Sequence, residues 1–208
     1  MHSATRPSGP ASEVPALPDA PDVLLIGGRS GVGKSSVGWE VAALLRAADV
    51  GHALIEGDVL DAVHPAPPGD PDRSRLTCRN LAALWANYAD LGCRRLVYTN
   101  TASVLDSEGW IFTEALGPAR LVRVLLTASD AAVQRRLAGR ERGSELDAQL
   151  RRSAFMARHL DTRVPADTHR VPTDGRTVSE VAAAVLRVTG WAARPPAAPA
   201  EHQADDRR

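Results

Sequence analysis

Short apolar runs alternate with helical patterns through the middle of the chain. The first run, Val23 to Ile26, is continuously apolar, which is typical of a strand buried on both faces. Four further runs complete the set, and the predicted strands lie at residues 23–26, 52–55, 96–98, 121–126 and 170–171. Strands that alternate with helices are typical of βαβ units around a parallel sheet. We therefore expect a three-layer α/β fold with a five-stranded parallel sheet.

Apolar residues at helical spacing predict the helices that connect these strands. After the first strand they recur at i, i+4, i+7, i+8 and i+11, starting at Val37. A second helix is predicted to end near Gly92, and a third to run from residue 131 into a charged stretch and give way near Gly143. Thr177 and Glu180 have the spacing of a capping box, which indicates the start of the last helix.

Both ends of the chain differ in composition from the middle. Residues 1–20 and 191–208 are rich in proline, serine and alanine and lack apolar periodicity, so we expect two disordered tails around one domain at 21–190. A length of 208 residues suits a single core. The chain has neither the apolar run of a signal peptide nor about 20 apolar residues for a membrane span. We expect a cytoplasmic protein with no membrane partner.

Charge and cysteine content exclude several classes of function. The 25 basic residues balance 25 acidic ones, so the chain has no net field to attract polyanions, and we expect no nucleic-acid partner. Two cysteines are too few for a disulfide scaffold, and no nearby ligands complete a zinc site. The basic set is strongly biased, because Lys34 is the only lysine.

That lysine falls in a glycine-rich segment between the first strand and the first helix. Residues 28–35 fit the pattern G-x-x-x-x-G-K-[ST], whose backbone N–H groups surround phosphate oxygens at a helix N-terminus. Lys34 is expected to reach the β- and γ-phosphates, and the Ser35 hydroxyl to bind Mg²⁺. The predicted nucleotide-binding residues here are Gly28, Ser30, Gly31, Val32, Gly33, Lys34, Ser35 and Ser36. For Arg29 the sequence indicates nothing beyond a solvent-facing position.

Other motifs narrow the class of phosphate-loop protein. A switch GTPase needs an N-K-x-D segment, and the chain has no second lysine for it. Many ATPases end a strand with an aspartate that polarises water, but here the third strand ends in Thr99-Asn100. Asn100 either orients a metal-bound water or caps a turn. Hydrolysis is therefore not the reaction that we expect.

The chain resembles the small-molecule kinases of the P-loop superfamily, the group of adenylylsulfate kinase, gluconate kinase, shikimate kinase and chloramphenicol phosphotransferase. The resemblance spans residues 23–188. It depends on the phosphate loop and on the order of weaker motifs, which are Glu56-Gly57-Asp58, His64-Pro65, Asp72-Arg73, an arginine-rich segment and Thr173-Asp174-Gly175. It implies ATP and Mg²⁺ as cofactors.

The resemblance also implies roles for residues outside the phosphate loop. His64 and Arg73 match positions that shape the acceptor pocket, although the segment between them departs from the gluconate pattern. Thr173 and Gly175 match the turn that touches adenine, or they form a plain turn. Arg136 and Arg140 are the candidate catalytic arginines of a lid at about residues 138–152, where the alternative is a solvated helix surface.

Asp58 is the candidate base, and the argument for it is also physical. Parallel strands bring their carboxyl ends to one edge of the sheet, so Asp58 at the end of the second strand should lie near the phosphate loop. A carboxylate there can accept the proton of an alcohol that attacks the γ-phosphate. The alternative is that Asp58 caps the following turn.

Together these features predict an ATP-dependent phosphotransferase that acts on a hydroxyl of a small molecule. Two alternatives stay open: a nucleotide-binding protein without kinase activity that acts through a protein partner, and a nucleotide kinase. The sequence does not name the acceptor, fix the preference for ATP or set the oligomeric state, for which a homodimer is one option.

Overall fold

The computed structural model describes residues 20–139 and 145–191, and these contain a five-stranded, fully parallel sheet. The strand order is β2-β3-β1-β4-β5. The strands are β1 Asp22–Gly27, β2 Ala53–Glu56, β3 Arg95–Thr99, β4 Arg120–Thr127 and β5 His169–Pro172. All five predicted strands are present, which confirms the predicted fold class.

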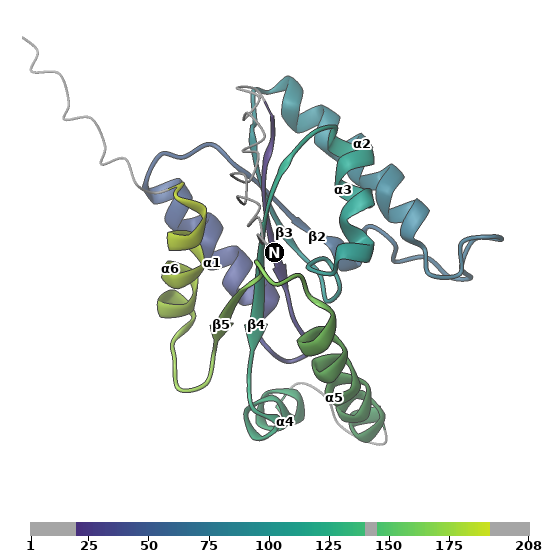
Figure 1. Cartoon of the computed structure of the whole chain (residues 1–208), viewed down its shortest axis with the longest axis vertical. Helices are drawn as coiled ribbons and strands as arrows, with labels where there is room; N and C mark the ends of the chain where they lie inside the picture. The colour runs from purple at the N-terminus through teal and green to yellow at the C-terminus, as the bar shows by residue number, and fades with distance from the viewer. Residues whose placement is uncertain (1–19, 140–144, 192–208) are drawn as a thin grey trace, which may run out of the picture.

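Helices cover both faces of the sheet (Figure 1). One face carries α1 Lys34–Ala47 and α6 Val178–Thr189, and the other carries α2 Ser74–Asp90, α3 Gly109–Leu116 and α5 Glu145–Arg163. The remaining elements are α4 Asp130–Ala138 and the 3₁₀ turns η1 Gly57–Val59 and η2 Asp106–Glu108. Thr177 and Glu180 form the predicted capping box at the start of α6.

Alternate residues of β1 supply the two halves of the core. Val23 and Leu25 pack with residues of α2 and α3, whereas Leu24 and Ile26 pack with residues of α1 and α6. All four side chains are fully buried. Burial of one such side chain is worth about 1.5–3 kcal/mol. Because β1 is the middle strand of the sheet and contributes to both halves of the core, it is the structural centre of the domain.

Two helices differ from the sequence prediction. The sequence pattern predicts no helix between the strands at 96–98 and 121–126, but this segment contains α3, whose Ile111 and Phe112 are buried against α2. A helix of 8 residues shows too few periods to be recognised in a pattern. The helix predicted to reach Gly143 ends earlier, because α4 stops at Ala138 and a separate helix, α5, begins at Glu145.

The core includes a residue that follows the predicted domain boundary. Trp191, assigned by the sequence to the C-terminal tail, is buried in the core beside α1 and α6. Its indole Nε1 donates to Oδ2 of Asp22 at 3.3 Å, and Arg120 pairs with the same carboxylate. Most of the two predicted tails lies outside the described residues. Among the helices of the described ranges, none is long and apolar enough to cross a membrane.

Candidate active site

The phosphate loop connects β1 to α1 at the carboxyl edge of the sheet. Gly28, Gly31 and Gly33 have φ values of +141°, +81° and +104°, a region that favours glycine. At Gly28 a Cβ would also lie 2.8 Å from the Leu126 carbonyl oxygen. No described side chain caps α1, so the first-turn N–H groups are left for an anion, as the motif predicts.

Lys34 extends back over the loop that precedes it. Its Nζ donates to the carbonyl oxygen of Gly28 at 2.9 Å and to that of Arg29 at 3.4 Å. Burial lowers the pKa of Lys34, and the negative charge of Asp58 opposes this change. The ammonium group therefore lies inside the loop and within the field of Asp58.

Ser35 meets a carboxylate that the sequence had not assigned to the site. The Ser35 hydroxyl donates to Oε2 of Glu56 at 3.0 Å, and the indole Nε1 of Trp39 donates to Oε1 of the same residue at 2.6 Å. Ser36 is exposed in the same first turn of α1. The position of Glu56, an acidic residue at the carboxyl end of β2, could have indicated a site residue. The resemblance instead assigned the role at this strand end to Asp58, two residues later.

The oxygen atoms of Ser35 and Glu56 fit the ligand preference of Mg²⁺. This ion is commonly held by one or two protein oxygens together with phosphate oxygens of the substrate. The described residues contain no group of three or more His, Cys, Asp or Glu side chains that could hold a metal alone. A metal here would therefore depend on the nucleotide as well as on these two side chains.

Asp58 lies on η1, directly after β2, and Asn100 follows the neighbouring strand β3. Asn100 donates from Nδ2 to Oδ1 of Asp58 at 2.7 Å, and its Oδ1 accepts from the Ala102 backbone N–H at 2.9 Å. Asn100 therefore both caps the turn after β3 and orients the carboxylate. The structure brings together Lys34, Ser35 and Asp58, as the shared strand edge predicts.

A cavity of about 220 Å³ lies beside Asn100, between α2, α3 and the end of β3. It is the candidate acceptor cavity. Its lining comprises Asp61, Asp72, Ser74, Thr77, Tyr98, Asn100, Ala102, Ser103, Glu108, Ile111 and Phe112. Neither His64 nor Arg73, predicted to shape the acceptor pocket, belongs to this lining. His64 is exposed, and Arg73 donates from Nε to the Val63 carbonyl oxygen at 3.1 Å.

Arg136 connects α4 to the turn after β5. Its Nη1 donates to Oγ1 of Thr173 at 3.0 Å and to the Val32 carbonyl oxygen at 3.2 Å, and its Nη2 donates to the Thr173 carbonyl oxygen at 3.2 Å. Val32 and Thr173 are buried, and Gly175 has a φ of +68°. Arg136, Val32 and Thr173 thus meet, as expected of one nucleotide site. Arg140 lies outside the described residues, so the lid stays a prediction.

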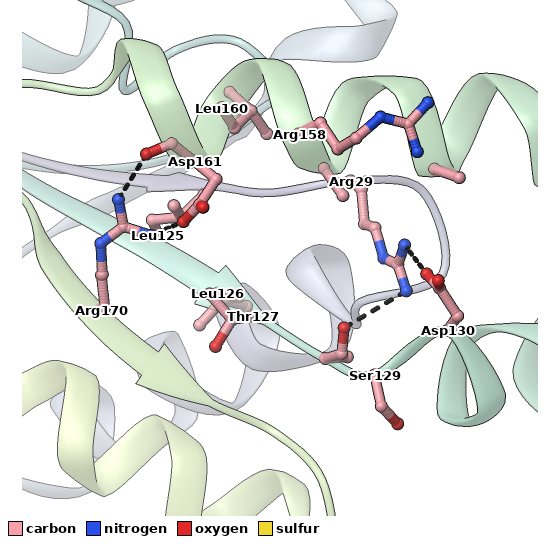
Figure 2. Close-up of a pocket in the computed structure, with 13 residues that line it drawn as sticks. Arg29, Leu125, Leu126, Thr127, Ser129, Asp130, Arg158, Leu160, Asp161 and Arg170 are labelled. Carbon is pink, nitrogen blue, oxygen red and sulfur yellow. Dashed lines mark hydrogen bonds and ion pairs between the residues drawn. The ribbon is translucent and has the colours of Figure 1, made fainter.

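Arg29 does not face solvent, which corrects the expectation from the sequence. The residue is 4% exposed, and its guanidinium donates to Asp130 at 2.5 Å and to the Ala128 carbonyl oxygen at 3.2 Å (Figure 2). Ser153 of α5 donates to the carbonyl oxygen of the next loop residue, Ser30, at 2.9 Å. The phosphate loop is therefore attached to α4, which ends where the predicted lid begins, and to α5, which begins inside the predicted lid.

Figure 2 also shows a second cavity behind the phosphate loop, between β4 and α5. It has a volume of about 370 Å³, with Arg29 and Asp130 at one end and the ion pair of Asp161 with Arg170 at the other. Its lining shares no residue with that of the acceptor cavity, so the two cavities are separate.

Comparison with solved structures finds this architecture in small-molecule kinases. A gluconokinase from Sinorhizobium meliloti is 22% identical, with a TM-score of 0.55 over 82% of this chain and 92% of that one. The APS kinase of Mycobacterium tuberculosis, solved in complex with AMPPNP and APS, is also 22% identical, with a TM-score of 0.51 over 82% and 98%. A tunicamycin resistance protein from Deinococcus radiodurans is 18% identical, with a TM-score of 0.53 over 82% and 96%.

Sequence comparisons add nothing to these structural ones. No protein-family model matches the sequence, and no curated protein matches it. The strand order, the phosphate loop and the similarity over about four fifths of the chain agree with the fold expected from the motifs. The chain has the three-layer P-loop fold of the small-molecule kinases.

Proposed function

We propose that the chain is a Mg²⁺-dependent phosphotransferase that moves the γ-phosphate of ATP to a hydroxyl group of a small molecule. The observation that carries this proposal is the pairing of Asp58 with Asn100 at the edge of the sheet that also bears Lys34. A carboxylate that is oriented by a neighbour, close to the phosphate loop and next to a cavity, suits a general base for an incoming alcohol.

Each group has a defined part in this reaction. The first-turn N–H groups of α1 and the Lys34 ammonium bind the phosphates and stabilise the charge that develops as the bond from the γ-phosphorus to the β,γ-bridging oxygen breaks. Asp58 accepts the proton of the acceptor hydroxyl as its oxygen bonds to the γ-phosphorus. Such a base is worth typically 10²- to 10⁴-fold in rate. ADP and a phosphate ester are the products.

Arg136 has a positioning part in the proposed enzyme. It holds the turn at Thr173 against the Val32 carbonyl of the phosphate loop. This contact fixes the distance between the phosphate site and the turn that is expected to meet the adenine. Ser35 and Glu56 would hold Mg²⁺, which when bound supplies charge neutralisation for the phosphate oxygens.

The test is ADP release by the purified protein with Mg-ATP, alone and with a panel of sugars, amino sugars, sugar acids, nucleosides and nucleotides. We expect one class of acceptor to stimulate release. Lys34→Ala should abolish the stimulation, and Asp58→Asn should lower it by roughly 10²- to 10⁴-fold with little change in the KM for ATP. Asp90→Asn, an exposed carboxylate on α2, is the matched control. Release that needs no acceptor and is equal in Asp58→Asn would contradict the proposal and favour a nucleotide-reading protein.

A further inference from the structure

The acceptor cavity differs in charge from the phosphate site next to it. Three carboxylates line it, those of Asp61, Asp72 and Glu108, and no Lys, Arg or His belongs to its lining. Within the described residues none of the three is part of an ion pair. The phosphate side, by contrast, has Lys34 and Arg136. All the charged side chains in the lining of the acceptor cavity are therefore carboxylates.

These carboxylates affect one another because they share a partly buried space. Burial, together with the charge of Asp58, raises the pKa of Asp61, while Arg73 opposes the change. Burial and the charge of Asp72 raise the pKa of Glu108. A ligand cation in the cavity would relieve this repulsion, whereas a ligand anion would increase it.

Tyr98 adds a neutral hydrogen-bonding group to the same cavity. Its side chain is only 2% exposed, and its ring packs edge-on against Phe112 with centroids 5.0 Å apart. Tyr98 belongs to the lining of the cavity. Burial, and then the charges of Asp61, Asp58 and Glu108, raise the pKa of Tyr98, so the phenol keeps its proton. It can donate to a ligand oxygen.

The phenol also lies close to the proposed base. A Cβ on Gly57 would stand 2.3 Å from the Tyr98 hydroxyl oxygen, so this oxygen lies against the backbone of the residue before Asp58. A ligand oxygen bound to Tyr98 is therefore near the turn that carries Asp58. The hydroxyl groups of Ser74, Thr77 and Ser103 complete a lining suited to a polyhydroxylated molecule.

We propose that this cavity selects a small hydroxylated acceptor that carries a protonated amine, such as an amino sugar or amino alcohol, and disfavours sugar acids and phosphorylated acceptors. The inference rests on the proposed kinase function, and it narrows the class of acceptor. The ammonium pairs with Asp72 and Glu108, and a hydroxyl of the same molecule lies between Tyr98 and Asp58. At about 220 Å³ the cavity is smaller than the roughly 300–1,000 Å³ of drug-sized sites, which favours a molecule of one ring.

The test uses sets of three compounds on one scaffold, for example glucosamine, glucose and glucuronate, with further sets built on pentoses and linear polyols. Binding is measured by ligand-observed NMR on the full chain with AMPPNP and Mg²⁺, and turnover by ADP release. We expect the amine to bind on the order of tenfold more tightly than the neutral compound. The acid should bind roughly 100-fold more weakly than the amine, because like charges oppose each other.

Charge-removing variants locate the effect. Asp72→Asn and Glu108→Gln should each reduce the preference for the amine over the neutral compound, and both together should abolish it, while the affinity for AMPPNP stays unchanged. Asp90→Asn, outside the cavity, should leave the preference intact. Melting temperatures show that the variants fold.

Failure of the inference and failure of the proposed function give different results. Binding of the acid equal to or tighter than that of the amine, a preference that survives the double variant, or no amine binding in any set would overturn the inference. Turnover of a sugar acid that depends on Asp58 would overturn the inference and leave the kinase function standing. Amine binding that depends on Asp72 and Glu108, without ADP release in any set, would support the cavity assignment and contradict the kinase function.

Discussion

Arg29, the second residue of the phosphate loop, is paired with Asp130, the first residue of α4, although the two lie 101 positions apart in the sequence. The arginine side chain is 5% exposed and the aspartate 85% exposed, so only one of the two charges is buried. The buried charge depends on its partner, because the other contact of the guanidinium is the Ala128 carbonyl oxygen alone.

Removing Asp130 should therefore destabilise the domain. We expect Asp130→Asn to lower the free energy of unfolding by about 1 kcal/mol, the scale of a charge-assisted hydrogen bond discounted for solvent exposure. Arg29→Met, which removes the buried charge and keeps an apolar chain, should cost less than Arg29→Ala. Urea denaturation measures the three values.

A double-mutant cycle tests whether the Arg29 and Asp130 side chains stabilise the domain as a pair. Asp130→Asn in the Arg29→Met background should have almost no effect, since the charge that needs the partner is gone. Asp167→Asn, at an exposed position that forms no ion pair within residues 20–139 and 145–191, is the control. Equal effects of Asp130→Asn in both backgrounds would show that the pair does not contribute.

The protonation of Lys34 should link nucleotide binding to pH. Burial lowers the pKa of Lys34 from 10.5 in the nucleotide-free protein, and phosphate oxygens would raise it again. ATP binding should therefore take up a proton at alkaline pH between the lowered pKa and 10.5. In the same window the unfolded chain holds more protons than the folded one, so the contribution of Lys34 to stability rises with pH there.

Calorimetry in two buffers of different ionisation enthalpy measures this proton uptake. The signal should fall as the pH drops below the lowered pKa of Lys34, because the side chain is then protonated in both states. Lys34→Arg should also lack it, because a guanidinium does not titrate in this range. Proton release, or equal uptake in Lys34→Arg, would contradict the assignment.

Asn100 is predicted to act on catalysis through Asp58. Asn100→Ala removes the donor to the carboxylate, and we expect kcat to fall by about 10- to 100-fold because the base loses its orientation. The KM for ATP should stay unchanged, since the Asn100 side chain is hydrogen-bonded to Asp58 and to the Ala102 backbone. Asn87→Ala, an exposed amide on α2, serves as the control. A rise in KM at unchanged kcat would place Asn100 in ATP binding instead.

The sequence predicted those features that depend on local pattern. The apolar run of β1 and the spacing of the phosphate loop both lie within one segment, so the sheet and the nucleotide site could be predicted together. Asp58 could be placed near Lys34 because a parallel sheet collects its strand ends at one edge. None of these inferences needs the direction of a side chain.

The features that were missed depend on which side chains meet across the fold. Arg29 reaches Asp130, and Glu56 reaches both Ser35 and Trp39, through contacts between segments that no periodicity relates. The carboxylates of the acceptor cavity likewise come from separate segments, with Asp61 and Asp72 between η1 and α2 and Glu108 on η2. A pattern shows which residues are polar, whereas the side-chain directions that decide their partners arise only on packing.

Trp39 is expected to report the occupation of the metal site. Its indole Nε1 donates to Glu56 at 2.6 Å while the residue is 58% exposed, so its fluorescence should depend on the state of that carboxylate. If Glu56 binds Mg²⁺ together with a nucleotide, its bond to the indole weakens and the emission changes. The change should need both Mg²⁺ and AMPPNP and should reverse when EDTA removes the metal. Trp39→Phe should lose the metal-dependent signal, because Trp85 and Trp191 are buried, and Trp110, which is 39% exposed, lies on α3 and is not bonded to Glu56. Glu56→Gln should bind AMPPNP without the metal-dependent change, and a metal-dependent signal that persists in this variant would exclude Glu56 as a ligand.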